Sequence, residues 1–166
     1  MRILSPKRRA NTLASIDLKQ LRSEGFVGLL IDLDNTIVPW RQSYISEEAK
    51  LFIKEAKALG YKICLFTNAK SQRTIPISLA LEIDNFSEAK KPFGVGFNTV
   101  IKTMGAKPEE VLMIGDQIFT DMLGGNRCGC YTILLPPISP NEFIGTKFLR
   151  IAERLCGYQQ DWREQP

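Results

Sequence analysis

Short apolar runs, bounded by polar or turn-forming residues, recur along this chain at regular intervals. Runs of this length are typical of strands buried on both faces of a parallel sheet. We predict four such strands at residues 26–33, 61–66, 111–114 and 131–135. A fifth, short strand is predicted at 83–87, where the chain passes from a helical pattern to a turn.

Between these runs, apolar residues are spaced three and four apart, which predicts amphipathic helices. The predicted helices span 47–59, 71–81, 93–104, 118–123 and 141–156. Glycine is expected to end three of them, at Gly60, at Gly105 and at the pair Gly124-Gly125. In the first of these helices we expect Leu51 to lie on the buried face.

Strands and helices alternate throughout, without repeats or low-complexity linkers. This order predicts an α/β fold, a doubly wound, Rossmann-like domain with a mainly parallel sheet. We place the domain at residues 26–157, after a lead-in segment (1–25) with one short helix and before a polar tail (158–166).

Composition agrees with one ordinary domain. The chain has 166 residues, of which 44% are hydrophobic and 24% charged, as in soluble globular proteins. No apolar run approaches the roughly 20 residues that a bilayer-spanning helix needs. The basic N-terminus is not followed by the apolar stretch of a secretory signal, so we expect a cytoplasmic protein.

The chain has no histidine, which excludes Ser-His-Asp and Cys-His catalysis and most zinc sites. We predict that its four cysteines are reduced packing residues. The net charge of +4 is mild, with basic residues concentrated near both ends. These ends are either a solvated surface or a surface that meets an anionic membrane. No nucleic-acid motif is present, and we expect no nucleic-acid partner.

Polar residues that could carry chemistry follow several of the predicted strands. Asp32 and Asp34 follow the first strand, Thr67 the second and Asp116 the fourth. In open α/β sheets, ligands bind at the carboxyl ends of the strands, so we expect these residues to converge. Alternation would point Asp32 and Asp34 to the same side, where their charges would repel unless a hard cation were bound.

This set of residues can support phosphoryl transfer. A carboxylate such as Asp32 can attack phosphorus, and Mg²⁺ held by Asp32 and Asp116 would offset the charge of the phosphate. Asp34 is placed to act as general acid and base, and Thr67 and Lys91 to bind the phosphoryl oxygens. Each motif alone has a local alternative, because Asp-Asn-Thr, Thr-Asn and Gly-Asp are common in caps and turns.

Four segments together resemble the haloacid dehalogenase (HAD) superfamily. They are Asp32-Leu33-Asp34-Asn35-Thr36, Thr67 at a strand end, Lys91-Pro92, and Gly115-Asp116 through Asp121. The resemblance covers about residues 26–135 and implies a phosphatase with an aspartyl-phosphate intermediate. Asp at position 34 resembles the phosphatases, since the transport ATPases of this superfamily carry threonine there.

The resemblance also implies roles. Asp32 would be the nucleophile and a metal ligand, and Asp34 the acid/base that gives its backbone carbonyl to Mg²⁺. Asp116 and Asp121 would complete the metal site. Thr67, Asn68 and Lys91 would bind the substrate phosphate; of the two adjacent lysines, Lys91 matches the motif better than Lys90.

The intervals between the motifs are too short for the inserted cap domains that many members of this superfamily carry, so we predict an open, capless site. An open site suits a large phosphate monoester: a phospholipid head group, a protein or a polymer. The closer resemblance is to the capless YqeG-type branch, class IIIA, which is similar to phosphatidylglycerophosphate phosphatases. It implies that lipid as substrate, with peripheral membrane contact through the basic ends, Trp40 and the Pro136-Pro137-Ile138 loop. A soluble sugar phosphate, nucleotide or phosphoprotein, or a non-catalytic regulatory or scaffold role, stays open, and the sequence specifies no oligomeric state.

Overall fold

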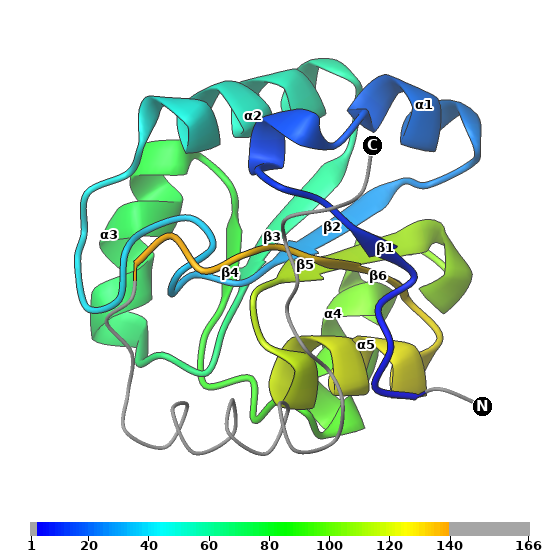
Figure 1. Cartoon of the computed structure of the whole chain (residues 1–166). Coiled ribbons are helices and arrows are strands. Elements are labelled where there is room, and N and C mark those ends of the chain that lie inside the picture. The colour runs from blue at the N-terminus through cyan, green and yellow to red at the C-terminus, as the bar shows by residue number, and fades with distance from the viewer. Residues whose placement is uncertain (1–2, 140–166) are drawn as a thin grey trace.

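The computed structural model describes residues 3–139, and its centre is one sheet of six parallel strands in the order β1-β6-β5-β2-β3-β4 (Figure 1). The strands are β1 (Arg8–Arg9), β2 (Gly28–Ile31), β3 (Lys62–Phe66), β4 (Asp84–Phe86), β5 (Val111–Gly115) and β6 (Tyr131–Leu134). The predicted α/β class and parallel sheet are therefore confirmed. Each of the five predicted strands is present, with small differences at its ends.

The helices are α1 (Leu18–Ser23), α2 (Glu47–Ala58), α3 (Ser71–Leu81), α4 (Gly94–Met104) and α5 (Leu123–Cys128). Three single turns complete the set: η1 (Leu13–Ser15) and η2 (Pro108–Glu110) are 3-10, and η3 (Ile118–Met122) is a π-helical turn. The predicted helix at 141–156 and the predicted tail at 158–166 lie outside the described residues.

Local sequence explains where the helices begin and end. The Ser46 hydroxyl accepts a hydrogen bond from the Ala49 backbone N–H at 3.1 Å and caps α2. The Asp17 carboxylate does the same for α1 through the Gln20 N–H at 2.8 Å. Gly105 ends α4 with φ of 60°, a left-handed conformation in which glycine has no Cβ penalty.

The N-terminal segment contributes a strand that the sequence did not predict. In β1, Arg8 pairs with Ile133 and Arg9 with Leu134 at the edge of the sheet. Two basic residues carry no apolar pattern, so this strand is defined by its partner β6 rather than by its own sequence. The segment before residue 26 therefore adds to the sheet as well as leading into it.

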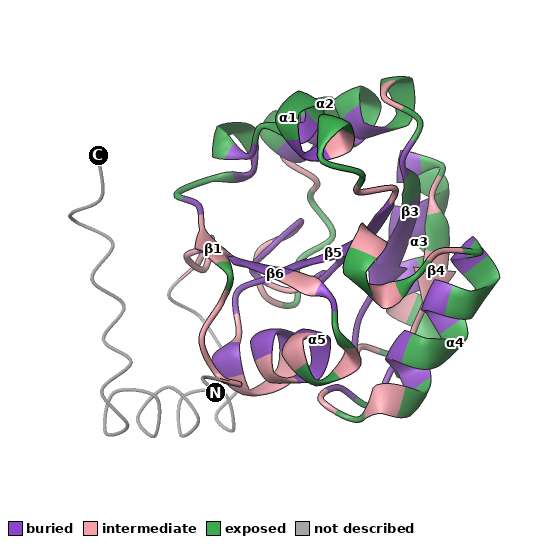
Figure 2. Cartoon of the chain, turned by 90° about the vertical axis from the view of Figure 1, so that its right-hand side faces the viewer, coloured by how far each residue is buried: buried purple, intermediate pink, exposed green. Residues whose placement is uncertain are grey.

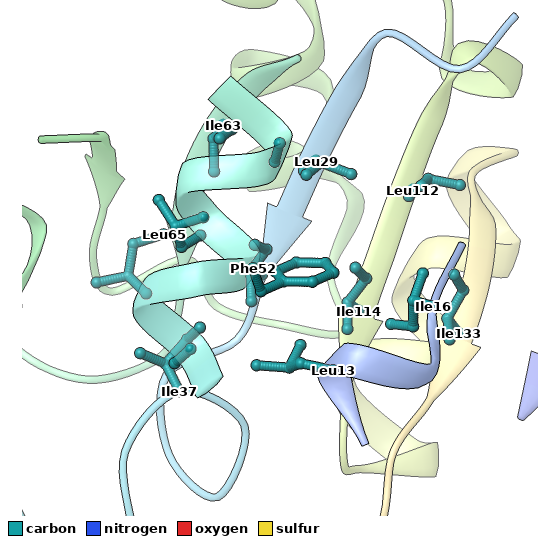
Figure 3. Close-up of a cluster of buried hydrophobic side chains, with 14 of the residues drawn as sticks. Leu13, Ile16, Leu29, Ile37, Phe52, Ile63, Leu65, Leu112, Ile114 and Ile133 are labelled. Carbon is teal, nitrogen blue, oxygen red and sulfur yellow. The ribbon is translucent and has the colours of Figure 1, made fainter. Parts of the chain in front are cut away.

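Helices cover both faces of the sheet. On one face, η1, α1, α2 and part of α3 enclose a core around Phe52 (Figures 1 and 3). On the other, α4 packs around Phe97, and the central strands are buried between the two layers (Figure 2). No helix in the described part of the chain is long and apolar enough to cross a membrane.

Two expectations about the helices are wrong. Leu51 is 63% exposed, because the buried face of α2 is formed by Ala49, Phe52, Ile53 and Ala56. The Gly124-Gly125 pair does not end a helix, since α5 continues through it to Cys128. A Cβ atom at Gly124 would lie 2.5 Å from Phe97 Cε2, and one at Gly125 would lie 2.7 Å from Thr132 Cγ2. Both glycines therefore permit close packing of α5.

The strand order places a topological switch point beside β2. From β2 the chain first adds β3 and β4 on one side and then crosses to β5, on the other side of β2. The carboxyl ends of β2 and β5 consequently diverge into loops on opposite sides, at the point where open α/β sheets bind ligands.

Candidate active site

Asp32 follows the last residue of the central strand β2. Its backbone N–H donates to the Ile114 carbonyl of β5 at 2.9 Å, which continues the sheet for one more residue. The residue is 4% exposed, and its Oδ1 accepts a hydrogen bond from Lys91 Nζ at 2.5 Å. A carboxylate at the end of a buried strand is thereby fixed by both its backbone and its side chain.

Lys91 links three segments of the chain. Besides Asp32, its Nζ donates to Asp121 Oδ1 at 2.6 Å and to the Phe66 carbonyl at the end of β3 at 3.0 Å. The Asn68 side chain holds the Lys91 backbone at both ends, accepting from its N–H at 2.7 Å and donating to its carbonyl at 3.1 Å. Lys90 is exposed, so Lys91 is the lysine that lies with the carboxylates.

Asp121 lies in the π-helical turn η3, a local widening that often occurs at functional sites. Its Oδ2 accepts from the Gln117 backbone N–H at 3.2 Å, while Oδ1 faces Lys91. The carboxylate packs directly on Gly115, where any Cβ atom would overlap it. Gly115 is therefore required beside Asp121 as well as in the turn after β5.

Asp116 completes a group of three buried carboxylates. One oxygen each from Asp32, Asp116 and Asp121 lies within 4.8 Å of the others, and both Asp116 and Asp121 are fully buried. Three carboxylates around the Lys91 ammonium concentrate negative charge in a buried site. Carboxylate oxygens in this arrangement fit a divalent cation such as Mg²⁺, which takes oxygen ligands from carboxylates and from water.

Burial and charge shift the ionisation of this group. Burial raises the pKa of Asp32 to about 7, because the opposing attraction of Lys91 does not fully offset desolvation and the repulsion of Asp121. For Lys91, burial would lower the pKa, but the Asp121 and Asp32 carboxylates outweigh it and raise the pKa. The ammonium is therefore held charged while Asp32 resists ionisation, and a bound cation would favour its ionised form.

Asp34 has other hydrogen-bond partners than the three buried carboxylates. Its two oxygens accept hydrogen bonds from Arg73, Nη1 to Oδ2 at 2.6 Å and Nη2 to Oδ1 at 2.7 Å. The Arg41 backbone N–H also donates to Oδ1, at 3.1 Å. Strand β2 ends at Ile31, so the expected alternation does not continue and the two aspartates lie in different surroundings. Repulsion between the two charges is nevertheless present, because Asp34 adds, as the smallest of the causes, to the raised pKa of Asp32.

The predicted phosphate-binding residues lie at the same edge. Thr67 is 2% exposed, directly after the Phe66 carbonyl that Lys91 contacts, and its Oγ1 accepts from the Ala69 N–H at 3.2 Å. Because the hydroxyl accepts there, its hydrogen stays available to a ligand. The amide of Asn68 is instead engaged with Lys91, which indicates a positioning role; a direct phosphate contact by Asn68 stays a prediction.

Sequence reasoning did not identify Arg73. It lies in the first turn of α3, 39 residues from Asp34, and nothing in the local pattern distinguishes it from a solvated arginine. Backbone strain also marks this edge, since four non-glycine residues with positive φ flank it: Asn35 (60°), Arg41 (58°), Glu88 (50°) and Lys90 (54°). Such residues gather where surrounding contacts fix an unfavourable backbone, often at functional sites.

Comparison with known proteins agrees with this geometry. A family model described as haloacid dehalogenase-like hydrolase matches residues 12–129. The chain is 34% identical over 149 residues to a probable phosphatase, YqeG, of Bacillus subtilis (strain 168), covering 90% of this chain and 87% of that protein. It is 30% identical to phosphatidylglycerophosphate phosphatase 1, chloroplastic/mitochondrial, of Arabidopsis thaliana, covering 78% of this chain but 40% of that longer protein.

Among solved structures, an uncharacterized protein from Listeria monocytogenes serotype 4b aligns with a TM-score of 0.58 at 16% identity, over 71% of this chain and 85% of that one. The cobalt-bound deoxy-D-mannose-octulosonate 8-phosphate phosphatase of Haemophilus influenzae aligns with a TM-score of 0.56 at 16% identity, over 68% of this chain and 69% of that one. At this identity the structural similarity concerns the fold.

Proposed function

The chain belongs to the haloacid dehalogenase-like hydrolase family and is a phosphatase, and from that premise we propose that it hydrolyses phosphate monoesters with Mg²⁺ through a phosphoryl group on Asp32. The observation that carries the proposal is the buried group of Asp32, Lys91, Asp116 and Asp121 at the carboxyl end of the sheet. A carboxylate held between an ammonium and a cation site can approach an anionic phosphate.

In the first step, an Asp32 carboxylate oxygen attacks phosphorus and the bond from phosphorus to the leaving oxygen breaks. The carboxyl of Asp34 gives its proton to that oxygen, and the alcohol departs. Lys91 and the Thr67 hydroxyl hold the phosphoryl oxygens as charge moves onto them. Arg73 orients the Asp34 carboxyl. Oδ1 accepts from both Arg73 and the Arg41 backbone N–H, whereas Oδ2 accepts from Arg73 and keeps a second position for the proton or the leaving oxygen.

In the second step, water attacks the phosphoryl group on Asp32. Asp34 now takes the proton from that water, and the bond between phosphorus and the Asp32 oxygen breaks to release inorganic phosphate. Mg²⁺, held by the side chains of Asp32, Asp116 and Asp121 and by the Asp34 carbonyl, would supply positive charge against the phosphoryl oxygens. Asp34 thus acts once as acid and once as base.

For the substrate we propose phosphatidylglycerophosphate, which would be hydrolysed to phosphatidylglycerol and phosphate. Support comes from the similarity to proteins named phosphatidylglycerophosphate phosphatase from Arabidopsis thaliana and Chlamydomonas reinhardtii. Among the described residues, Ile138 is half exposed and Trp40 partly exposed, as residues that touch a membrane surface would be. We propose that the protein acts from the cytoplasm as a peripheral membrane enzyme.

The test is phosphate release from phosphatidylglycerophosphate in mixed micelles, with Mg²⁺ or with EDTA, beside a panel of sugar phosphates, nucleotides and phosphopeptides. We expect turnover of the lipid that depends on Mg²⁺ and is lost in Asp32→Asn, whose amide is a much poorer nucleophile. Higher catalytic efficiency on a soluble phosphate would overturn the lipid assignment. Comparable turnover by Asp32→Asn would overturn the mechanism.

A further inference from the structure

Arg73 makes a two-pronged contact with Asp34 at the edge of the site. Both of its terminal nitrogens donate to the Asp34 carboxylate, at 2.6 and 2.7 Å, and Nη2 also donates to the Gln42 carbonyl at 3.0 Å. One side chain therefore joins the start of α3, the end of β2 and the loop that follows β2. The Arg73 and Asp34 side chains are 24% and 20% exposed, so solvent or a ligand can reach them.

The guanidinium is not fully used by these contacts. A guanidinium carries five N–H donors, and the three hydrogen bonds above use three of them. The Nε atom is buried and has no hydrogen-bond partner among the described residues. Because Nε has no exposed surface, a ligand acceptor would be bound through the second N–H of Nη1, which the three hydrogen bonds above leave unused.

Arg73 lies on the side of the site where the leaving group of the substrate would be bound. Asp34 is the group that meets the leaving oxygen, and Arg73 is in direct contact with Asp34. Atoms attached to the leaving oxygen would therefore lie near the guanidinium. Two further basic residues are close to this contact along the chain: Lys70 is exposed three residues before Arg73, and the Arg41 backbone N–H donates to the same Asp34 carboxylate at 3.1 Å.

We propose that Arg73 is a specificity residue, which binds an anionic group carried by the leaving group of the substrate; this rests on the proposed phosphatase function. A planar guanidinium matches the paired oxygens of a phosphodiester or a carboxylate better than an ammonium does. The enzyme would thus favour phosphate monoesters whose alcohol bears a second negative charge. A phosphodiester and a carboxylate would both be bound in this way, and the assay below distinguishes between them.

The experiment measures kcat/KM for three soluble substrates with the full chain and Mg²⁺. Glycerol 3-phosphate has a neutral leaving group; 3-phosphoglycerate has a carboxylate in place of the hydroxymethyl group. Glycerophosphoglycerol phosphate carries a phosphodiester on the same glycerol. Because charge-assisted hydrogen bonds are stronger than neutral ones, we expect at least one anionic leaving group to be preferred about 10- to 100-fold. The substrate with the larger preference identifies the source.

The ratio of kcat/KM for an anionic leaving group to kcat/KM for the neutral one tells whether Arg73 binds the leaving group or only positions Asp34. In Arg73→Gln the preference should fall to about one, with Arg73→Lys between, whereas a merely structural role would lower all three values equally and leave the ratio unchanged. Lys102→Gln is the matched control, because Lys102 is exposed at the far end of α4, near the amino end of β3, where the Lys62 side chain contacts α4. It should retain the wild-type ratio.

Three outcomes would overturn the proposal. Equal efficiency on all three substrates by the wild type would refute it and leave the phosphatase function standing. An unchanged ratio in both Arg73 variants would show that Arg73 only positions Asp34. A wild type that hydrolyses neither these substrates nor the lipid would refute the proposed function, and this inference with it.

Discussion

Replacing Asp32 with asparagine should stabilise the metal-free protein at neutral and alkaline pH, although it removes the proposed nucleophile. Burial raises the pKa of Asp32 from 3.8 to about 7 in the fold, against the attraction of Lys91. Because the pKa of Asp32 is higher in the folded than in the unfolded state, the contribution of Asp32 to stability is full below pH 4. This contribution is lost as the pH rises through 7 and folded Asp32 ionises.

The size of the effect follows from this shift. A difference of about three units, at about 1.4 kcal/mol per unit, makes ionised Asp32 destabilising by about 4 kcal/mol at pH 8. Asparagine has nearly the same shape as the protonated acid and does not ionise. Its gain in free energy of unfolding should therefore be near zero at pH 4 and rise to several kcal/mol at pH 8.

The assay is urea unfolding, followed by circular dichroism in EDTA at pH 4, 6 and 8. Asp84→Asn is the control, because Asp84 is an exposed carboxylate at the edge of the sheet; its effect should stay within about 0.5 kcal/mol. A difference between wild type and Asp32→Asn that is constant over pH, or that falls as pH rises, would refute the reasoning. Mg²⁺ should reverse the order at pH 8, because it stabilises the wild type by binding to ionised Asp32.

Two substitutions and one labelling experiment test the packing of the site and of the core. Gly115→Ala should abolish measurable phosphatase activity and weaken Mg²⁺ binding in calorimetry, since its Cβ atom would overlap the Asp121 carboxylate; retained activity would contradict this contact. Gly124→Ala should lower the free energy of unfolding by about 1–3 kcal/mol in urea titrations, because its Cβ atom would lie 2.5 Å from Phe97, and Phe97→Leu should relieve part of the loss. The buried Cys64 thiol, whose pKa burial raises to about 12, should resist iodoacetamide at pH 8 until the protein unfolds, as peptide mass spectrometry would show; rapid labelling of the folded protein would count against its burial.

The sequence determined the order of the elements and the edge of the sheet at which the candidate site residues lie. Continuous apolar runs such as 111–114 identify buried strands because a parallel sheet is covered on both faces. The strand ends then indicate where Asp32, Thr67 and Asp116 must meet, since parallel strands end at one edge. The three cysteines in the described residues are free, as predicted.

Contacts between distant segments determined two features of the fold that local sequence patterns do not predict. The edge strand Arg8–Arg9 exists because β6 offers it backbone partners, and the helix through Gly124 continues because Phe97 packs against it. Neither partner is a neighbour in sequence, so periodicity and turn propensity gave no signal, or the wrong one.

Asp32 and Asp34 also show what the sequence determines and what only the tertiary structure decides. Their spacing in sequence placed Asp32 and Asp34 at the end of β2, and the spacing alone suggested crowded carboxylates. The folded chain gives Asp32 to Lys91 and Asp34 to Arg73, each far away in sequence. The charge on a side chain is written in the sequence, but the group that balances it is chosen by the packing of distant segments, and that partner determines what the side chain can do.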